Sequence, residues 1–173
     1  NMFLLLMEVI ALVDLDEIRS IIVKGLKEEL KIPIIRSNQT GPSPKYPYLS
    51  YTITSLINDR KGTFGEYEDG MHRKPGTQTW SLTVQSDRAD EAMALCIKAR
   101  DWLDHTGGIY LKDNKIIVQS VGAVNNRDTL LTIEYENRFG FDFVLWFLNE
   151  TGNLRERTGT IETVNVKKEI KAP

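Results

Sequence analysis

Two histidines and one cysteine are the side chains of this chain that could carry nucleophilic or metal chemistry. His72 lies in a polar segment beside Arg73 and Lys74, whereas Cys96 and His105 lie in a segment with helical periodicity. Cys96 falls on the apolar stripe of that segment, where a thiol is expected to be buried and inert rather than paired with His105 as a nucleophile. Neither histidine has a cysteine or a carboxylate at a spacing typical of zinc ligands. The sequence therefore predicts no catalytic residues, no metal site and no cofactor.

Charged side chains that could make polar contacts gather in the last third of the chain. Arg138 and Asp142 are four residues apart on one face of a predicted strand, which is too far for a direct contact along that strand. We therefore expect each of them to pair across strands or across subunits. Arg127 and Asp128 lie in a polar segment that is typical of a turn, with a polar site as the alternative interpretation.

The segment from Glu134 to Leu148 predicts a long strand with two different faces. Its odd-numbered positions are mostly aromatic, whereas its even-numbered positions are charged or polar up to Asp142 and apolar at Val144, Trp146 and Leu148. Because strand side chains alternate between faces, the aromatic face must lie in the core. The apolar end of the other face needs a second covering partner, either a helix of the same chain or another subunit. The segment indicates packing and assembly rather than chemistry.

Two more segments, Tyr48 to Ile57 and Thr77 to Ser86, alternate apolar and polar side chains in the same way. This alternation is typical of an antiparallel sheet with one buried face and one polar face. Shorter strands are expected at Ile34–Ile35 and at Ile116–Val121.

Helical periodicity predicts two helices, which run from Asp14 to Leu30 and from Asp87 to Leu103. Asp14 and Asp87 are the expected N-caps, and Gly107–Gly108 is expected to end the second helix.

The segment between the two alternating strands, Asn58 to Gly76, is polar and rich in glycine. A loop of this length is usually functional or disordered. It also contains Phe64, Tyr67 and Met71, which a fully solvated loop would not need. We therefore predict an extended hairpin that becomes ordered against a partner.

The order of helix, strands, helix and strands predicts an α+β two-layer sandwich, in which two helices pack on one face of a mainly antiparallel, possibly mixed, sheet. The chain has 173 residues, of which 41% are hydrophobic and 27% are charged, and this favours a single domain. We place that domain at residues 14–150, with an apolar N-terminal arm or helix extension at 1–13 and a polar C-terminal tail or arm at 151–173. The apolar arm is too short to span a bilayer, which needs about 20 residues.

The net charge of −2 disfavours a protein that binds nucleic acid, because such proteins usually carry a basic excess. The single cysteine fits a reduced compartment, since it cannot form a disulfide within the chain.

Several motifs, in this order along the chain, resemble the bacteriophage neck or tail-terminator proteins, and the resemblance covers roughly Asp14 to Glu150. They are Pro47-Tyr48-Leu49-Ser50-Tyr51 after a proline-rich loop, Trp80 to Ser86 before a helix that starts with an aspartate, Asn126-Arg127-Asp128, and Glu134-Tyr135-Glu136 through Arg138 to Gly140-Phe141-Asp142-Phe143.

The resemblance implies a structural protein of a tailed phage or prophage that assembles into a ring, commonly of six subunits. Such a ring caps the finished tail tube, stops further addition of tube protein and offers a surface to the head connector. It also implies assembly in the cytoplasm of the bacterial host, a place in the virion, and DNA that passes through the lumen without specific binding. No membrane is implied.

We expect the subunit or partner contacts of such a ring at Phe64, Tyr67, Met71, Arg127, Asp128, Arg138, Asp142 and Trp146. If Arg138 is an interface residue, Arg138→Glu should leave a folded monomer and weaken assembly. Two alternatives stay open. One is a head-completion or connector protein, and the other is a small ligand-binding or enzymatic domain that uses the long loop as a lid. A deep pocket with convergent polar groups would favour that last alternative.

Overall fold

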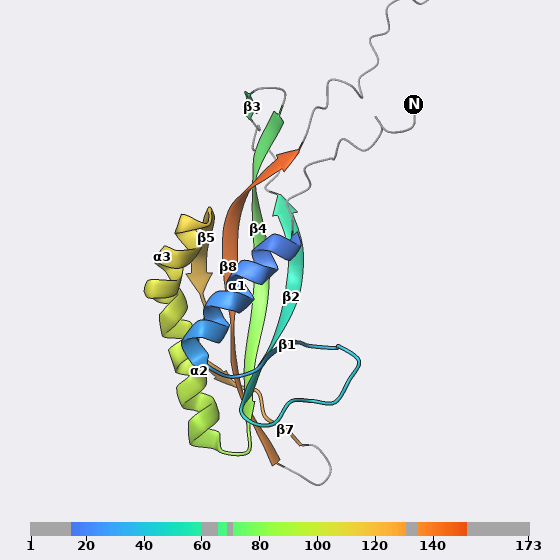
Figure 1. The fold of residues 1–173 in the computed structure, drawn as a ribbon, viewed down its shortest axis with the longest axis vertical. Helices are drawn as coiled ribbons and strands as arrows, with labels where there is room; N and C mark the ends of the chain where they lie inside the picture. The colour runs from blue at the N-terminus through green and yellow to red at the C-terminus, as the bar shows by residue number, and fades with distance from the viewer. Residues whose placement is uncertain (1–14, 60–65, 69–70, 131–134, 152–173) are drawn as a thin grey trace, which may run out of the picture.

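In the part of the chain that the structure describes, three helices lie on one face of a single long sheet and form a second layer (Figure 1). The computed structural model describes residues 15–59, 66–68, 71–130 and 135–151. Within these ranges, the side chains of residues 58–59, 66–68, 71–73, 129–130, 135 and 149–151 are not described. The predicted α+β class and two-layer arrangement are confirmed, and the helical layer contains one helix more than expected. The expected arms at 1–13 and 151–173, the Asp14 cap and Phe64 lie essentially outside the described residues.

The helices are α1 Leu15–Leu30, α2 Ala89–Asp104 and α3 Thr106–Asp113. The strands are β1 Ile34–Arg36, β2 Tyr48–Asp59, β3 Glu66–Glu68, β4 Met71–Ser86, β5 Ile116–Val121, β6 Asn125–Asn126, β7 Thr129–Leu130 and β8 Tyr135–Thr151.

The sheet is mixed, with the strand order β1-β2-β4-β8-β5. β1 runs parallel to β2, and the other neighbouring strands are antiparallel. The two longest strands, β4 and β8, pair along almost their whole lengths and form the centre of the sheet. β2 and β4 form the extended hairpin that the sequence predicts, with pairing that reaches Asp59 and Gly76, and β3 continues along β4. The partner expected for this hairpin stays a prediction.

The core lies between the sheet and the helices, on the face that the alternating patterns predict. Trp80, Leu82 and Val84 of β4 are buried there. The odd-numbered residues of β8 from Phe141 to Phe147 are buried beside them. Ile22 and Leu26 of α1 close the core from the helical side, as the spacing of the apolar residues requires.

Gly107 and Gly108 do not end the helical region, as the sequence suggested, because both lie inside α3. α2 ends at Asp104, His105 breaks the helix, and α3 begins at Thr106. A Cβ at Gly107 would lie 2.2 Å from Cδ2 of Trp102. The glycine is therefore needed for the close approach of α3 to the Trp102 ring and not as a stop signal.

Asp87 is not the N-cap of α2, because the cap position is Arg88 and no side chain caps it. Ser86 holds this end of the helix instead. Its hydroxyl accepts a hydrogen bond from the Arg88 backbone N–H at 3.1 Å and donates one to the Glu91 carboxylate at 2.6 Å. Ser86 thus ties the residue before α2 to the first turn of the helix, but it accepts no hydrogen bond from the N–H groups of that turn as an N-cap side chain would.

Candidate functional site

The face of the sheet that carries none of the described helices is the candidate contact surface, because most of the predicted contact residues map to it. Along β8 the even-numbered side chains lie on this face. They change from polar at Glu136, Arg138 and Asp142 to apolar at Trp146 and Leu148. The two ends of this surface are built differently, and each is described in turn.

At the polar end, Arg127 crosses β8 and contacts β4. Its Nη1 donates to Ser81 Oγ at 2.7 Å and to Thr83 Oγ1 at 3.0 Å, and its Nη2 donates to Asp142 Oδ1 at 2.8 Å. The crossing passes over Gly140, where a Cβ would lie 2.8 Å from Nη1. A glycine in the middle of an aromatic strand is the sequence signal for such a close approach, and the sequence reasoning did not use it.

The charge of Asp142 is stabilised by this arrangement. Burial is the largest single influence and by itself raises the pKa of the carboxyl. The hydrogen bond from Ser81, together with the hydrogen bond and positive charge of Arg127, outweighs it, so the pKa is lowered. Arg127 and Asp142, both expected at subunit contacts, therefore form an ion pair within the chain. Their roles between subunits stay a prediction.

Asp128 and Arg138 also have partners within the chain. Asp128 Oδ1 accepts a hydrogen bond from the Arg138 backbone N–H at 2.6 Å, which fastens the β6–β7 turn to β8. Arg138 forms an ion pair with Glu136, with Nε at 2.7 Å from Oε2. The Glu136 side chain is only 6% exposed. Because Arg138→Glu would place a second carboxylate beside this buried one, it would perturb the fold as well as any interface.

Glu136 also fastens the proline-rich loop at residues 37–47 to the sheet. Its Oε1 accepts hydrogen bonds from the hydroxyls of Tyr46 at 3.0 Å and Tyr48 at 3.2 Å. The two tyrosine rings are stacked, with centroids 5.6 Å apart. Burial, the largest influence, and the Glu136 carboxylate both raise the pKa of Tyr48, so its hydroxyl stays a donor.

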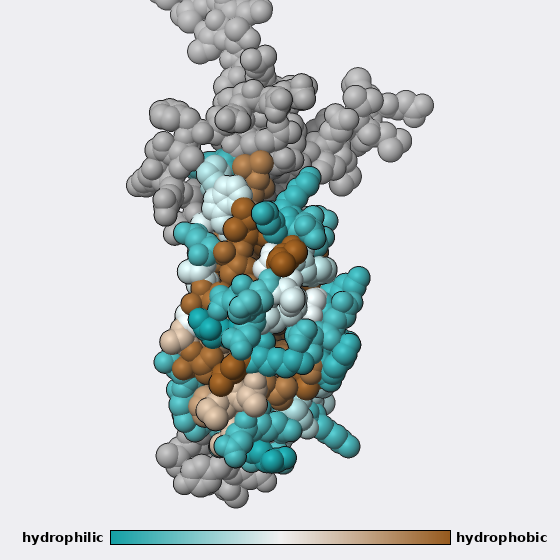
Figure 2. Space-filling model, turned by 90° about the vertical axis from the view of Figure 1, so that its left-hand side faces the viewer, coloured by the Kyte–Doolittle hydropathy of each residue, from teal (hydrophilic) through white to brown (hydrophobic). Residues whose placement is uncertain are grey.

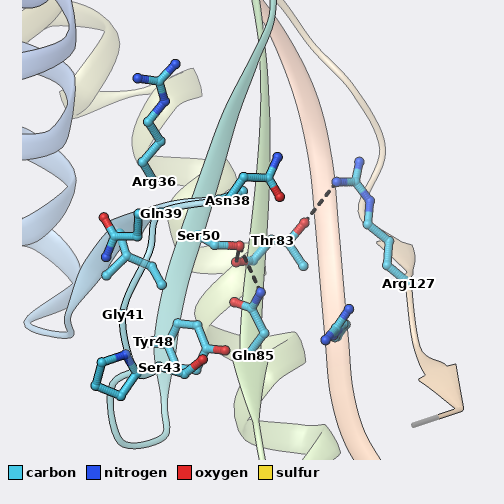
Figure 3. Close-up of a pocket in the computed structure, with 14 residues that line it drawn as sticks. Arg36, Asn38, Gln39, Gly41, Ser43, Tyr48, Ser50, Thr83, Gln85 and Arg127 are labelled. Carbon is cyan, nitrogen blue, oxygen red and sulfur yellow. Dashed lines mark hydrogen bonds between the residues drawn. The ribbon is translucent and has the colours of Figure 1, made fainter.

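A polar pocket of about 380 Å³ lies between this loop and the sheet (Figure 3). Ser50, Thr83 and Gln85 line its sheet side, and Figure 3 shows the Arg127 side chain extending toward Thr83 from the opposite side. The Gln85 amide bonds to the Ser50 hydroxyl at 2.8 Å in either orientation of the amide. These polar groups bond to one another across β2 and β4 rather than converge on an open binding position.

At the apolar end of the same face, three strands place side chains at one level. Thr77 of β4 is paired with Trp146 of β8, which is paired with Ile117 of β5. Ile117 is 43% exposed and Leu148 is 41% exposed. The covering partner that the sequence analysis required for this strip is thus not a helix among the described residues.

Apolar side chains are also exposed on the side of the molecule that carries α2, α3 and β5, where they interrupt a mainly hydrophilic surface (Figure 2). Met93 and Ile97 belong to α2, and Ile109 belongs to α3. Of the other expected contact residues, Tyr67 lies in β3 and Met71 begins β4. The side chains of Tyr67 and Met71 lie outside the described part of the chain.

Of the residues first considered for chemistry, the structure describes the side chains of Cys96 and His105 but not that of His72. Cys96 is fully buried, and burial raises the pKa of its thiol to about 12. His105 Nδ1 lies 2.8 Å from the backbone carbonyl oxygen of Asp101. Within the described ranges, no three His, Cys, Asp or Glu residues form a group that could hold a metal ion.

Comparison with protein families identifies the chain. The sequence pattern of the phage neck terminator proteins matches residues 15–172. The chain belongs to the phage neck terminator protein family. The match begins with α1 and continues past Glu150, where the resemblance seen in the sequence ended. No curated protein matches the chain.

Membership in the family makes this chain a structural protein of a phage neck, a component of the virion that associates with other tail or head proteins. The described helices include none that is long and apolar enough to cross a membrane. The face without helices, with a rigid polar end and an exposed apolar end, is the surface on which such contacts are to be sought.

Proposed function

We propose that this protein forms a ring, of six subunits as is common for the proteins that it resembles, that caps the tail tube of a phage or prophage. In this role the ring ends polymerisation of the tube and joins the tail to the head connector. The observation that carries the proposal is the family match over residues 15–172. We further propose that the ring is assembled in the cytoplasm of the bacterial host and becomes part of the virion neck.

The described surface supports a protein that works through contacts. The apolar strip formed by the half-buried Trp146 and the exposed Leu148 and Ile117 would be covered by a neighbouring subunit or by the tube. The β2–β4 hairpin, with Tyr67 and Met71 near its tip, would reach beyond the body of the subunit toward a partner. Arg127, Asp128, Arg138 and Asp142 would provide a rigid polar surface at the other end of the sheet.

The charge of the chain suits a ring with DNA in its lumen. The net charge is −2, with 22 Lys and Arg residues and 24 Asp and Glu residues. Because non-specific DNA binding depends mainly on basic residues that neutralise phosphates, a nearly neutral ring would let DNA pass without holding it.

Localisation of the protein on purified parts of the virion tests this function. The tagged protein is mixed separately with purified tail tubes and with purified head connectors, and bound particles are imaged by electron microscopy. We expect one ring on one end of each tube. Binding to the head connector with no binding to tube ends would instead identify a head-completion protein and overturn the proposal.

A further inference from the structure

β5 forms one edge of the sheet, and its outer side is unpaired within the described ranges. The strand, Ile116–Val121, contains no charged residue, and Ile117 is 43% exposed. Natural proteins usually protect edge strands with charged residues, prolines or covering segments, because an open edge pairs readily with another strand. An uncharged edge with an exposed isoleucine is therefore expected to be covered in the assembled protein.

The opposite edge of the sheet is also open along part of its length. β1 pairs only with Leu49–Tyr51 of β2, so that the outer side of β2 from Thr52 onward has no paired strand among the residues that the structure describes. Leu56 is 56% exposed and Ile57 is 37% exposed on this stretch. The first charged residue of the stretch is Asp59, at its end.

The two open edges lie at the same level of the sheet. Ser55 of β2 is paired with Thr79 of β4, Thr79 with Val144 of β8, and Val144 with Ser120 of β5. At one end of the open stretch, Asp59 is connected in the same way, through Gly76 and Phe147, to Ile116. The open part of β2 and the strand β5 therefore lie at the same height on the two opposite edges of the sheet.

The directions of the two strands are also compatible. Each step from β2 to β4, from β4 to β8 and from β8 to β5 is antiparallel, so β5 runs opposite to β2. A second copy turned about an axis roughly along the strands would keep these directions. Its β5 would then lie antiparallel to the open part of β2, which is the arrangement that strand addition requires.

We infer that β5 of one copy adds to the open part of β2 of the next copy, so that the sheets of neighbouring subunits become continuous. This inference rests on the proposed ring and specifies its subunit contact. The contact joins two different edges, and head-to-tail contacts of this kind generate closed rings when the rotation allows.

Irregularities in both edge strands fit a curved assembly. The pairing of β2 shifts register between Ile53 and Ser55, and the pairing of β5 shifts between Val118 and Ser120. Such irregularities bend a strand and increase its twist. Strands added at these positions would therefore continue the sheet around a ring rather than extend it flat.

Paired cysteines test the contact directly. The double variant Ser55→Cys with Ser120→Cys places a thiol on each edge at the same level, and both changes are nearly isosteric. Residues directly opposite each other on antiparallel strands have Cα atoms about 4.5–5.5 Å apart, well within reach of a short bismaleimide cross-linker. The native Cys96 is buried and does not interfere. The full-length protein is cross-linked in solution and on tube ends, and products are separated on denaturing gels.

We expect a ladder of covalent multimers that ends at the subunit number of the ring in the double variant. Either single variant should give no ladder, because residue 55 is expected to meet only residue 120. The pair Ser20→Cys with Ser120→Cys is the matched control, since Ser20 is exposed on α1 in the helical layer and belongs to neither edge strand, and it should also give no ladder.

A matched pair of lysine variants provides a second test. Ile117→Lys would bury a charge in the contact and should weaken ring formation by about tenfold or more. Ile109→Lys introduces the same charge on α3, where Ile109 is 64% exposed, and should change ring formation by no more than about twofold. Light scattering across a concentration series measures both.

The outcomes separate this inference from the proposed function. Rings that form without a ladder, or that are unaffected by Ile117→Lys, would overturn the edge-to-edge contact and leave the capping function standing. A chain that remains monomeric both alone and with tube ends would overturn the ring and the contact together.

Discussion

The guanidinium of Arg127 lies over Gly140. Because residue 140 has no side chain, Arg127 can cross β8 and contact β4. A Cβ at residue 140 would lie 2.4 Å from the Leu82 carbonyl oxygen and 2.8 Å from Arg127 Nη1. The polar end of the candidate contact surface depends on this close approach, because Arg127 joins Ser81, Thr83 and Asp142 across two strands.

Gly140→Ala should destabilise the protein by about 1–3 kcal/mol, because the added methyl group meets backbone on one side and Arg127 on the other. Urea unfolding followed by circular dichroism measures this. Ser120→Ala, at an exposed position on neighbouring β5, is the control and should change the free energy of unfolding by no more than about 0.5 kcal/mol. Equal stabilities of Gly140→Ala and the unchanged protein would show that the contact of Arg127 with β4 does not require a glycine at residue 140.

Glu136→Gln should destabilise the protein by roughly 1–3 kcal/mol, because a buried carboxylate that bonds to Tyr46, Tyr48 and Arg138 would be replaced by a neutral amide. Tyr46→Phe removes only one of these donors, from a residue that is 43% exposed, and should cost less. The same urea titration measures both variants. If Glu136→Gln cost no more than Tyr46→Phe, the carboxylate would not be what holds the loop.

Asp142 should make stability depend on pH in the acidic range. Its pKa in the folded protein lies below the value of about 3.9 expected for the unfolded chain. The unfolded state therefore takes up the proton first, and the stabilisation that is present above that value is lost as pH falls toward the folded pKa.

The free energy of unfolding of the unchanged protein should therefore fall more steeply between neutral pH and the acidic range than that of Asp142→Asn. The comparison is made by urea unfolding at a series of pH values, since the other carboxyls titrate equally in both proteins. Parallel pH profiles would argue against the Arg127–Asp142 pair as the cause.

Cys96 should be unreactive in the folded protein. With a pKa of about 12, roughly one thiol in ten thousand would be ionised at pH 8, and the side chain is fully buried. A colorimetric disulfide reagent should detect no thiol in native buffer and one thiol per chain in denaturant. Rapid reaction under native conditions would show that α2 opens readily from the sheet.

The parts of the fold that follow from periodicity could be predicted from the sequence. The alternation in β8 and β4 identified the buried face, since only one register of a strand places Trp80 and Phe143 in the core. The apolar end of β8 at Trp146 and Leu148 could be predicted on the same grounds. Family membership followed from the order of structural motifs and not from a catalytic signature.

The parts that depend on close approach between distant residues could not be predicted in the same way. Gly107 resembles a helix stop, and only the position of the Trp102 ring explains why it lies inside a helix. Ser50 and Gln85 lie on the polar face that the sequence predicts to be solvated, yet each is only 7% exposed beneath the loop at residues 37–47. Neither effect has a local sequence pattern, because both depend on segments that meet only in the folded chain.

Arrest of tube growth by the purified protein is the most direct test of tube capping. Tail-tube protein is polymerised from purified tail tips in the presence and absence of this protein, and tube lengths are measured by electron microscopy. We expect that substoichiometric amounts of the protein stop elongation and that each arrested tube carries one terminal ring. Tubes that reach the same lengths with and without the protein, and that carry no ring, would show that the protein does not cap tubes.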